Sequence, residues 1–466
     1  MGLLLYPKLF MAVADKLSAG SLLLACPPIH LLLLVGLLLV AAGVYLTKCR
    51  RSTVYLIDYA CSEGMANCRV PIAAYVEHLH LNPNFDSQGI SFMTRMLEGC
   101  GIGNETSLPQ SDHYIPPLSC GIQDARAEAE LVLFPVIDDV LAKAGITPEA
   151  IDVLVVNCSL FAPVPSISDM IVNRYRLRDD VKAVNLSGMG CSAGVISVGL
   201  ASGLLQQATG RTAARYALVV STEIITSNFY NGNDRAMQLS NVLFRVGGSA
   251  ALLSTSDQGR ARFRLSHLVR TSTAGTHDGS HSCIVQQEDD EGILGIKLSK
   301  DLVKIAGEAL KANITAIAPL VLPLSEKLRF VMSLAARRLR LLVRAKTAVM
   351  EPRAVPDFRK AFDHFCVHCG GRAVIDRVQR SLGLSDEQVE ASRMTLRRFG
   401  NTSSSSVWYA MAHIEAKGRM RKRDRVWMIA FGAGFKCNSA VWECIRPAEE
   451  PDKAWAGCIL RYPIKS

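Results

Sequence analysis

Aromatic residues and charge are both scarce in this 466-residue chain, at 6% and 20% of the sequence. The sequence has no cysteine pair followed by a histidine pair at zinc-finger spacing, and it has no basic and aromatic motif of the kind that stacks on RNA bases. After residue 60 it has no Pro/Ser-rich linker and no low-complexity tract. These absences argue against a nucleic-acid-binding protein. They also favour one compact body over the three domains that length alone would suggest.

Hydrophobic residues make up 49% of the chain, which is enough for a large core and excludes a disordered or fibrous protein. Lysine and arginine exceed aspartate and glutamate by 52 to 42, and this net charge of +10 suits an anionic lipid surface or an anionic ligand such as a CoA thioester. The fourteen cysteines are scattered, several within apolar runs such as 155–158. This pattern predicts reduced core thiols in a body that faces the cytosol.

A long apolar run near the N-terminus, residues 22–46, predicts a transmembrane helix. The basic cluster at 48–51 predicts that everything after it lies on the cytoplasmic side. The alternative is a signal peptide cleaved near 40–42, which the basic flank and the free thiols oppose. A shorter apolar stretch, 3–13, is interrupted too early to span a bilayer, and it is expected to form an interfacial helix or half of a hairpin.

A second stretch with membrane character lies at 325–349, within an expected insertion at about 315–350. On a helical wheel its apolar residues share one face and its arginines another. The apolar face holds Val331, Met332, Ala335, Leu339, Leu342 and Val343, and the basic face holds Arg337, Arg338, Arg340 and Arg344. An amphipathic helix packed on the protein core is the equally weighted alternative.

Three junctions in the chain join an apolar strand, a glycine turn and a helix. In the first, residues 181–186 alternate as a strand, glycines follow, and 192–208 have helical spacing. Cys191 lies at the turn, where a helix N-terminus would favour its thiolate. A cysteine between glycines is more often an ordinary packed residue, so this signal is weak when taken alone.

The second junction, 364–371, contains two histidines four residues apart, followed by helical spacing over 372–382. The residues between His364 and His368 favour a strand, which would separate the imidazoles by about 13 Å and argues against a metal site. His364 is equally well explained as a satisfied core histidine. His368, beside two glycines at the strand end, is the better catalytic candidate.

The third junction places Asn401 after Phe399 and Gly400, followed by serines 403–406 that are good helix caps. Asn401 also has an ordinary explanation as a turn residue. A last apolar strand, 426–430, ends in a glycine turn at 431–434 that can direct backbone N–H groups at a ligand. Together the junctions put a thiol, an imidazole and a carboxamide at the ends of apolar strands, where α/β folds keep their sites.

In combination these stretches resemble the plant-type 3-ketoacyl-CoA synthases, the condensing enzymes of very-long-chain fatty acid elongation in the thiolase superfamily. The similarity runs from about Val54 to Trp442 and rests on several long segments in order. They are Val155–Phe161, Asn185–Gly194, Gly232–Arg235 with Leu243–Gly248, Gly370–Asp376 and Arg398–Ser406.

The resemblance implies that Cys191 is acylated and that His368 and Asn401 complete a catalytic triad. It implies a duplicated, five-layer αβαβα fold of the α/β class, with an N-terminal membrane anchor. We therefore expect an anchor at 1–51, a first half at 52–257, a second half at 258–446 and a C-terminal tail at 447–466. Members of the family sit in the endoplasmic reticulum membrane, usually through two N-terminal helices.

Two positions depart from many relatives, which carry histidine where this chain has Ser272 and Arg397. Neither position belongs to the triad, so we expect activity with altered tuning. The expected substrates are acyl-CoA and malonyl-CoA, with no cofactor and no metal. The expected partners are a homodimer mate and the reductase and dehydratase subunits of an elongase.

The chemistry follows from the residue types. A Cys191 thiolate attacks an acyl-CoA thioester, and the backbone N–H groups of Cys191 and Gly434 are expected to hold the oxyanion. His368 and Asn401 then donate to the enolate formed as malonyl-CoA loses CO₂. A soluble type III polyketide synthase shares this triad, but the apolar run at 22–46 argues against it. A non-catalytic elongase scaffold is the alternative from another class.

Overall fold

The computed structural model describes Gly36 and residues 53–466 except 65, 111–120, 208–214, 277–278, 344–355 and 464–466. The chain divides into two compact units, Met1–Ser52 and Thr53–Ser466, and the second of these contains all the elements below. The predicted transmembrane segment at 22–46 and the stretch at 3–13 lie outside the described residues, Gly36 excepted. Of the helices that are described, none has both the length and the apolar character to cross a bilayer.

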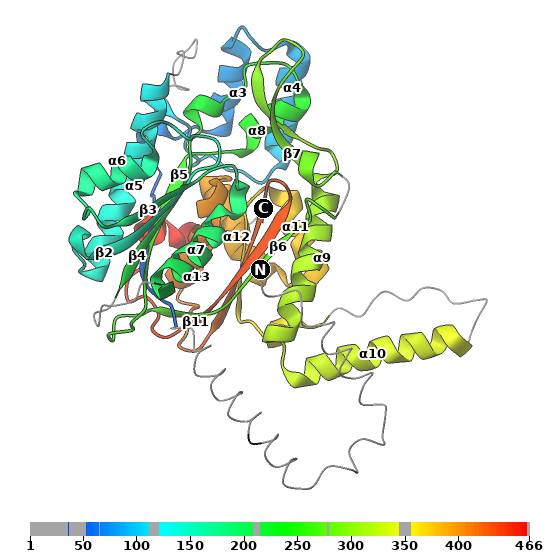
Figure 1. The fold of residues 1–466 in the computed structure, drawn as a ribbon. Helices are drawn as coiled ribbons and strands as arrows, with labels where there is room; N and C mark the ends of the chain where they lie inside the picture. Colours follow the sequence, from blue (N-terminus) through cyan, green and yellow to red (C-terminus); the bar gives the residue numbers. More distant parts are fainter. Residues whose placement is uncertain are drawn as a thin grey trace. The chain divides into compact units, whose positions relative to one another are not determined.

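The described strands form one nine-stranded sheet, in the order β3-β2-β4-β5-β1-β6-β11-β10-β9, and a separate hairpin of β7 and β8 (Figure 1). The strands of the sheet are β1 (Tyr55–Cys61), β2 (Ile151–Asn157), β3 (Lys182–Leu186), β4 (Tyr216–Glu223), β5 (Gly247–Ser254), β6 (Phe263–Ser272), β9 (His364–Val367), β10 (Arg425–Gly432) and β11 (Lys436–Cys444). The hairpin consists of β7 (Ile284–Glu288) and β8 (Leu294–Leu298).

The strand order repeats on the two sides of the antiparallel pair β1 and β6. Outward from β1, strand β5 is antiparallel, β4 is antiparallel to β5, and β2 and β3 are parallel to β4. Outward from β6, strand β11 is antiparallel, β10 is antiparallel to β11, and β9 is parallel to β10. The sheet therefore contains the same strand arrangement twice, and the second copy runs in the opposite direction to the first. Along the chain, the first half ends with β5 and the second begins with β6.

Helices cover both faces of this sheet and divide the core into two hydrophobic clusters. Along β2, Leu154 and Val156 belong to the outer cluster, whereas Val153 and Val155 belong to the inner one, because neighbouring side chains of a strand point to opposite faces. The outer helices are α5 (Ile122–Ala144) and α6 (Ile167–Tyr175) on the first half, and α9 (Leu302–Val321) and α11 (Arg372–Leu382) on the second.

Two helices fill the inner layer between the half-sheets: α7 (Ala193–Gln207) and α13 (Ser406–Ala416). Helix α7 contacts β2 and β4 of the first half and also β10 and β11 of the second. Its sequence is apolar or small on every side, as a helix buried between two layers requires. The architecture is therefore the expected five-layer αβαβα arrangement, and Figure 1 shows α7 and α13 at its centre.

The remaining helices lie around this frame. They are α3 (Ile72–Leu81), α4 (Ser87–Gly99), α8 (Arg235–Leu243), α10 (Leu324–Val343), α12 (Asp386–Phe399) and α14 (Lys453–Ala456). The predicted C-terminal tail, 447–466, carries α14 and is part of the body. Trp455 is fully buried, and its indole N–H donates to the Tyr409 carbonyl at 2.9 Å. The cysteines that the structure describes are free thiols, and all of them are buried except the half-buried Cys191.

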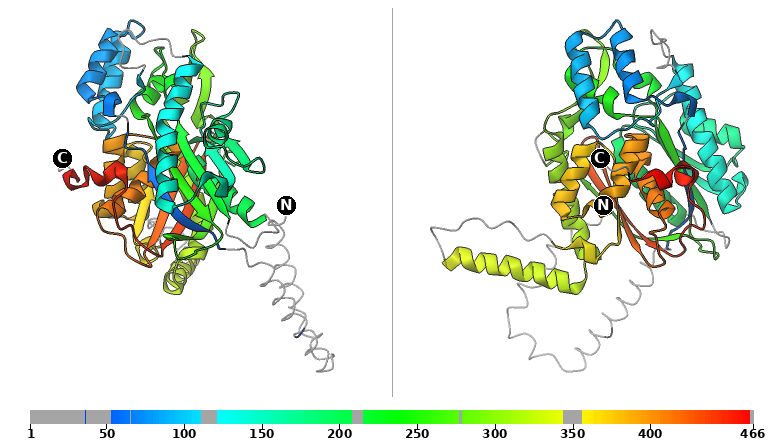
Figure 2. Two further views of the ribbon diagram at one scale, coloured as in Figure 1. Left: turned by 90° about the vertical axis from the view of Figure 1, so that its left-hand side faces the viewer. Right: turned by 180° about the vertical axis from the view of Figure 1, so that it is seen from behind.

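Helix α10 projects away from the body in Figure 1 and in the right-hand view of Figure 2. Four large apolar side chains on it are strongly exposed: Leu324 (70%), Leu328 (54%), Val331 (59%) and Met332 (69%). Their spacing puts them on one face of the helix. For Val331 and Met332, two residues of the predicted apolar face, the alternative that this face packs on the core is wrong; the predicted basic face lies outside the described side chains.

Candidate active site

Cys191 lies in a tight turn between β3 and α7. The turn packs directly against the loop that joins β10 to β11, in the other half of the fold. A Cβ atom on Gly190 would lie 2.3 Å from the Ala433 nitrogen, and one on Gly432 would lie 2.6 Å from the Met189 carbonyl oxygen. Only glycine permits this approach. The two glycine turns therefore bring Cys191 of the first half next to the second half.

His368 follows the last residue of β9, and it is buried. Its backbone N–H donates to the Ile429 carbonyl at 2.8 Å, and its Nδ1 atom lies 2.7 Å from the Ser406 hydroxyl. That hydroxyl accepts the Cys369 N–H, so its own hydrogen is available to Nδ1. This arrangement favours the tautomer with hydrogen on Nε2, the atom next to Gly370.

Burial lowers the pKa of His368 to about 4, so the imidazole is neutral near pH 7. A neutral imidazole with hydrogen on Nε2 can donate to a developing oxyanion without bringing a positive charge of its own. This is the chemistry that the sequence suggested for His368.

Asn401 follows α12 in a turn that fixes which end of its amide is free. The Oδ1 atom accepts the backbone N–H of Ser403 at 2.9 Å. No described residue accepts a hydrogen bond from Nδ2. Because an amide has one acceptor end and one donor end, the Ser403 contact leaves the donor end for a ligand.

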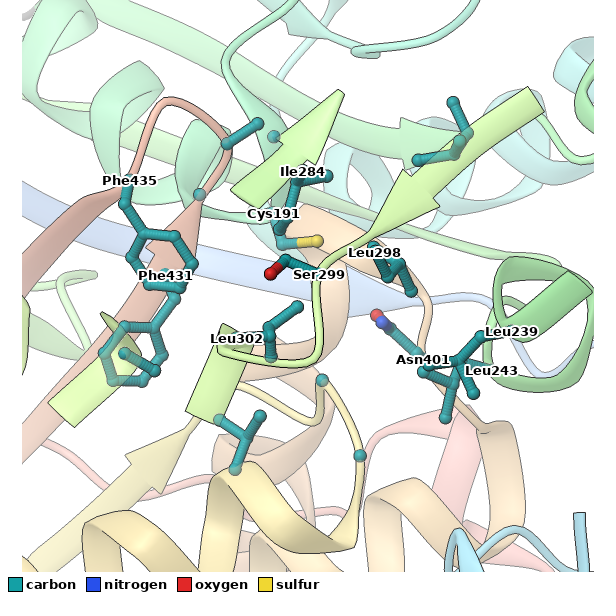
Figure 3. Close-up of a pocket in the computed structure, with 18 of the residues that line it drawn as sticks. Cys191, Leu239, Leu243, Ile284, Leu298, Ser299, Leu302, Asn401, Phe431 and Phe435 are labelled. Atoms are coloured by element: carbon teal, nitrogen blue, oxygen red, sulfur yellow. The ribbon is translucent and has the colours of Figure 1, made fainter. Parts of the chain in front are cut away.

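One cavity of about 790 Å³ joins these residues. Cys191, His368 and Asn401 all line it, and Figure 3 shows the Cys191 sulfur and the Asn401 amide directed into the same space. The rest of the lining is mainly apolar, and its volume lies within the range of small-molecule sites. Apolar lining residues include Leu239, Leu243, Ile284, Leu298, Leu302, Phe431 and Phe435.

A backbone N–H favours the Cys191 thiolate, as expected at a helix N-terminus, but burial opposes it more strongly. Burial raises the pKa of the thiol to about 12, and the charge of Glu223 raises it as well, although a backbone N–H lowers it. No hydrogen bond or ion pair joins Cys191 to His368 in the described structure. The resting thiol is therefore neutral because desolvation outweighs the helix terminus.

The serines at 403–406 do not act as side-chain caps of α13, contrary to the sequence interpretation. Each hydroxyl instead forms a hydrogen bond with a different residue, in the site or in the structure that supports it. Ser403 Oγ contacts Glu223, Ser404 Oγ contacts Asn157, Ser405 Oγ contacts Thr402, and Ser406 Oγ contacts His368. The serine run connects the two halves beneath the cavity.

The remaining sequence candidates separate into two groups. Gly434 and Ser272 line the cavity with Cys191. His364 does not line it, and its Nε2 atom lies 2.8 Å from an Asp424 oxygen at a second, separate pocket. Arg397 lines neither pocket, and its carbonyl accepts the Gly103 N–H at 2.8 Å. His364 is thus a histidine satisfied by Asp424, but it is half-buried rather than part of the core. No group of metal-ligating side chains occurs among the described residues.

Sequence reasoning missed Glu223, a buried carboxylate that lines the cavity at the end of β4. The available signal was an acidic residue shortly after the apolar run 216–220, where a buried charge needs partners. Ser403 was interpreted only as a cap. Its φ of +54° is rare for a residue other than glycine and costs about 1–3 kcal/mol, and strain of this kind concentrates at functional sites.

Known proteins are similar to this chain in sequence, and others are similar to it in fold. The family model described as FAE1/Type III polyketide synthase-like protein matches residues 45–339, and that of the 3-oxoacyl-[acyl-carrier-protein (ACP)] synthase III C terminal matches 359–444. From Arabidopsis thaliana, 3-ketoacyl-CoA synthase 5 is 52% identical over 94% of this chain and 86% of its own length. From the same plant, 3-ketoacyl-CoA synthase 6 is 54% identical over 88% and 81%.

Among solved structures, the C-terminal type III polyketide synthase domain of a Dictyostelium hybrid synthase superposes with a TM-score of 0.65. The match covers 84% of this chain and 99% of that domain, at 17% identity. At that identity the likeness shows the fold alone, which is the thiolase-like fold of type III polyketide synthases.

Proposed function

This chain belongs to the FAE1/type III polyketide synthase-like family, as one of the 3-ketoacyl-CoA synthases, and we propose that Cys191, His368 and Asn401 carry its condensing reaction. Such a synthase joins malonyl-CoA to a long-chain acyl-CoA with loss of CO₂, which is the first step of very-long-chain fatty acid elongation. The observation that carries the proposed roles is the single cavity lined by a thiol from one half of the fold and an imidazole and a carboxamide from the other.

In the first half-reaction the Cys191 sulfur attacks the acyl-CoA carbonyl and loses its proton. The carbonyl oxygen becomes an oxyanion, which the backbone N–H groups of Cys191 and Gly434 stabilise. Collapse of this intermediate breaks the bond to CoA, whose sulfur leaves as a thiolate and takes up the proton that Cys191 lost. The acyl chain is then held as a thioester on Cys191, and the apolar lining of the cavity shields it from water.

In the second half-reaction malonyl-CoA enters and its carboxylate leaves as CO₂. The electron pair moves onto the thioester carbonyl, and the resulting enolate oxygen accepts hydrogen bonds from His368 Nε2 and Asn401 Nδ2. The enolate carbon attacks the acyl thioester and expels the Cys191 sulfur, which regains a proton. The product is a 3-ketoacyl-CoA two carbons longer than the starting acyl group.

Basic side chains along the cavity lining support a CoA-linked substrate. Arg95, Lys300, Arg372 and Lys436 all line the cavity, and the phosphates of CoA need such partners. The only acidic lining residue in the described part of the chain is Glu223, which is buried. The charge of the cavity therefore matches an anionic carrier with an apolar acyl chain.

An elongation assay tests the function directly. The full chain in microsomes should incorporate labelled malonyl-CoA into products two carbons longer across a ladder of acyl-CoA lengths. A single extension per acyl chain is expected. Repeated extension would instead indicate a polyketide synthase-like reaction, and no extension of any acyl-CoA together with no acyl-enzyme adduct would indicate a scaffold.

We propose further that the protein resides in the endoplasmic reticulum membrane, with residues 22–46 as its anchor and the catalytic body in the cytosol. The apolar run and its basic flank support the anchor. The exposed apolar face of α10 supports a second contact, in which the helix lies in the membrane interface. The basic residues in the sequence of α10 suit anionic lipid: Lys327, Arg329, Arg337, Arg338 and Arg340.

A homodimer, and association with the ketoacyl reductase, dehydratase and enoyl reductase of an elongase, are part of the same proposal.

A tryptophan placed on α10 tests this second contact. In full chain carrying Met332→Trp and reconstituted in vesicles, lipids with brominated acyl chains should quench the added fluorescence. Quenching should strengthen when phosphatidylserine is included with phosphatidylcholine, because the helix is basic. The native Trp408, Trp427, Trp442 and Trp455 are buried and give a constant background.

The matched control is Ser91→Trp, an exposed position on α4 at the opposite end of the body from α10 in Figure 1. Its fluorescence should not respond to the brominated lipid. Equal quenching at both positions, or none at Met332→Trp, would contradict an interfacial role for α10.

A further inference from the structure

A buried carboxylate lies directly beneath the cavity and has partners on both halves of the fold. Glu223 ends β4 and is 2% exposed. Its Oε1 atom accepts the backbone N–H groups of Ser159 at 3.0 Å and Leu160 at 2.9 Å, and also the Cys158 thiol at 3.3 Å. These three donors belong to the segment after β2. They hold the carboxylate rigidly within the first half, in one orientation.

The other oxygen of Glu223 reaches the second half. Oε2 accepts a hydrogen bond from the Ser403 hydroxyl at 2.9 Å, across 180 residues of sequence. Ser403 is 1% exposed, and its backbone lies in the left-handed region. The contact with Glu223 and the donation of its N–H to Asn401 help to hold this unfavourable conformation.

Ser403 touches two of the three residues proposed to carry the reaction. Its N–H fixes Oδ1 of Asn401 and so leaves Nδ2 for the substrate, and its side chain is a hydrogen-bond partner of the Cys191 thiol. A thiol can donate to the Ser403 oxygen while the Ser403 hydroxyl donates to Glu223. Cys191, Ser403 and Glu223 thus form one chain of polar contacts in an otherwise apolar wall.

We propose that Ser403 and Glu223 form a positioning pair. The pair fixes the position of the Cys191 sulfur relative to the Asn401 amide across the interface of the two halves of the fold. This inference rests on the proposed roles of Cys191 and Asn401. Neither member needs to touch the substrate's reacting atoms. Glu223 orients the Ser403 hydroxyl, and Ser403 in turn orients the nucleophile and the enolate donor.

The pair also predicts how the reactivity of Cys191 depends on pH. The Glu223 charge raises the pKa of the Cys191 thiol. Removing that charge should therefore move the pH profile of Cys191 alkylation to lower pH. Among the described residues, Glu223 is the titratable group whose charge acts on the thiol, and the Ser403 changes leave that charge in place.

The experiment compares Ser403→Ala and Glu223→Gln with the unmodified full chain in microsomes. Each should reduce the elongation rate about tenfold or more, the usual size of a lost hydrogen bond to a charged group. Iodoacetamide alkylation of Cys191, followed by peptide mass across pH, should shift to lower pH in Glu223→Gln. Ser403→Gly removes the hydroxyl but accepts the left-handed backbone, so it replaces Ser403→Ala if that variant does not fold.

The matched control is Ser405→Ala, which lies in the same short turn and bonds only to Thr402. It should leave both the rate and the alkylation profile unchanged. The positioning pair is overturned if Ser403→Gly and Glu223→Gln both elongate at the rate of the unmodified chain and show its alkylation profile. The proposed function itself fails on a different result, namely an acyl adduct that survives Cys191→Ala.

Discussion

Replacing Cys191 with alanine should abolish covalent acyl transfer and, with it, elongation. The thioester needs a nucleophile at this position, and no other thiol among the described residues lines the cavity except Cys100. Cys100 caps the end of α4, where its sulfur donates to the Leu97 carbonyl at 3.1 Å. Intact mass after incubation with a long-chain acyl-CoA should show an acyl adduct in the unmodified chain and none in Cys191→Ala.

Cys100→Ala is the matched control, because it removes a thiol of the same cavity. It should retain the adduct and most of the elongation rate. Peptide mass should locate the adduct on Cys191 in both the unmodified chain and this control. An adduct on another residue, or elongation by Cys191→Ala at the native rate, would show that the nucleophile has been misassigned.

Replacing Asn401 with aspartate should separate the two half-reactions. Aspartate keeps an oxygen for the Ser403 N–H, but it cannot donate a hydrogen bond to the enolate. Loss of one preorganised oxyanion donor costs about 3–4 kcal/mol, or roughly 10²–10³ in rate. The acyl adduct should therefore still form, while condensation with malonyl-CoA falls by that factor.

The comparison with Asn401→Ala distinguishes donation from packing. Alanine also releases the Ser403 N–H, so this variant should lose at least as much condensation as Asn401→Asp and should disturb Cys191 as well. Acylation is measured by intact mass and condensation by labelled malonyl-CoA. Condensation by Asn401→Asp at the native rate would refute the role of Nδ2 as a donor.

Sequence patterns located the local elements around the site well. The strand before His368 and the helix after it are β9 and α11, and α11 has the expected bounds, 372–382. The turn at Cys191 and the strand at 426–430 were also placed correctly. These features depend on side-chain periodicity and on glycine, which act between residues close in the chain.

The errors concern residues whose partners lie far away in the chain. The serines after Asn401 look like caps because a neighbouring helix begins there, yet their hydroxyls reach Glu223, Asn157 and His368 instead. The thiol of Cys191 was expected to ionise because only the helix terminus is visible locally. The tertiary structure adds an apolar cavity and a buried carboxylate, and both oppose the thiolate.

The sequence by itself determined which residue types stand at the ends of the apolar strands, and so identified Cys191, His368 and Asn401 as candidates. It also established the amphipathic character of α10. Only the tertiary structure decided that these three groups share one cavity, that α10 leaves its apolar face exposed, and that Ser403 joins Glu223 across the two halves. The reason is physical: periodicity and turn chemistry act over a few residues, whereas burial and the pairing of distant polar groups arise only when the halves pack together.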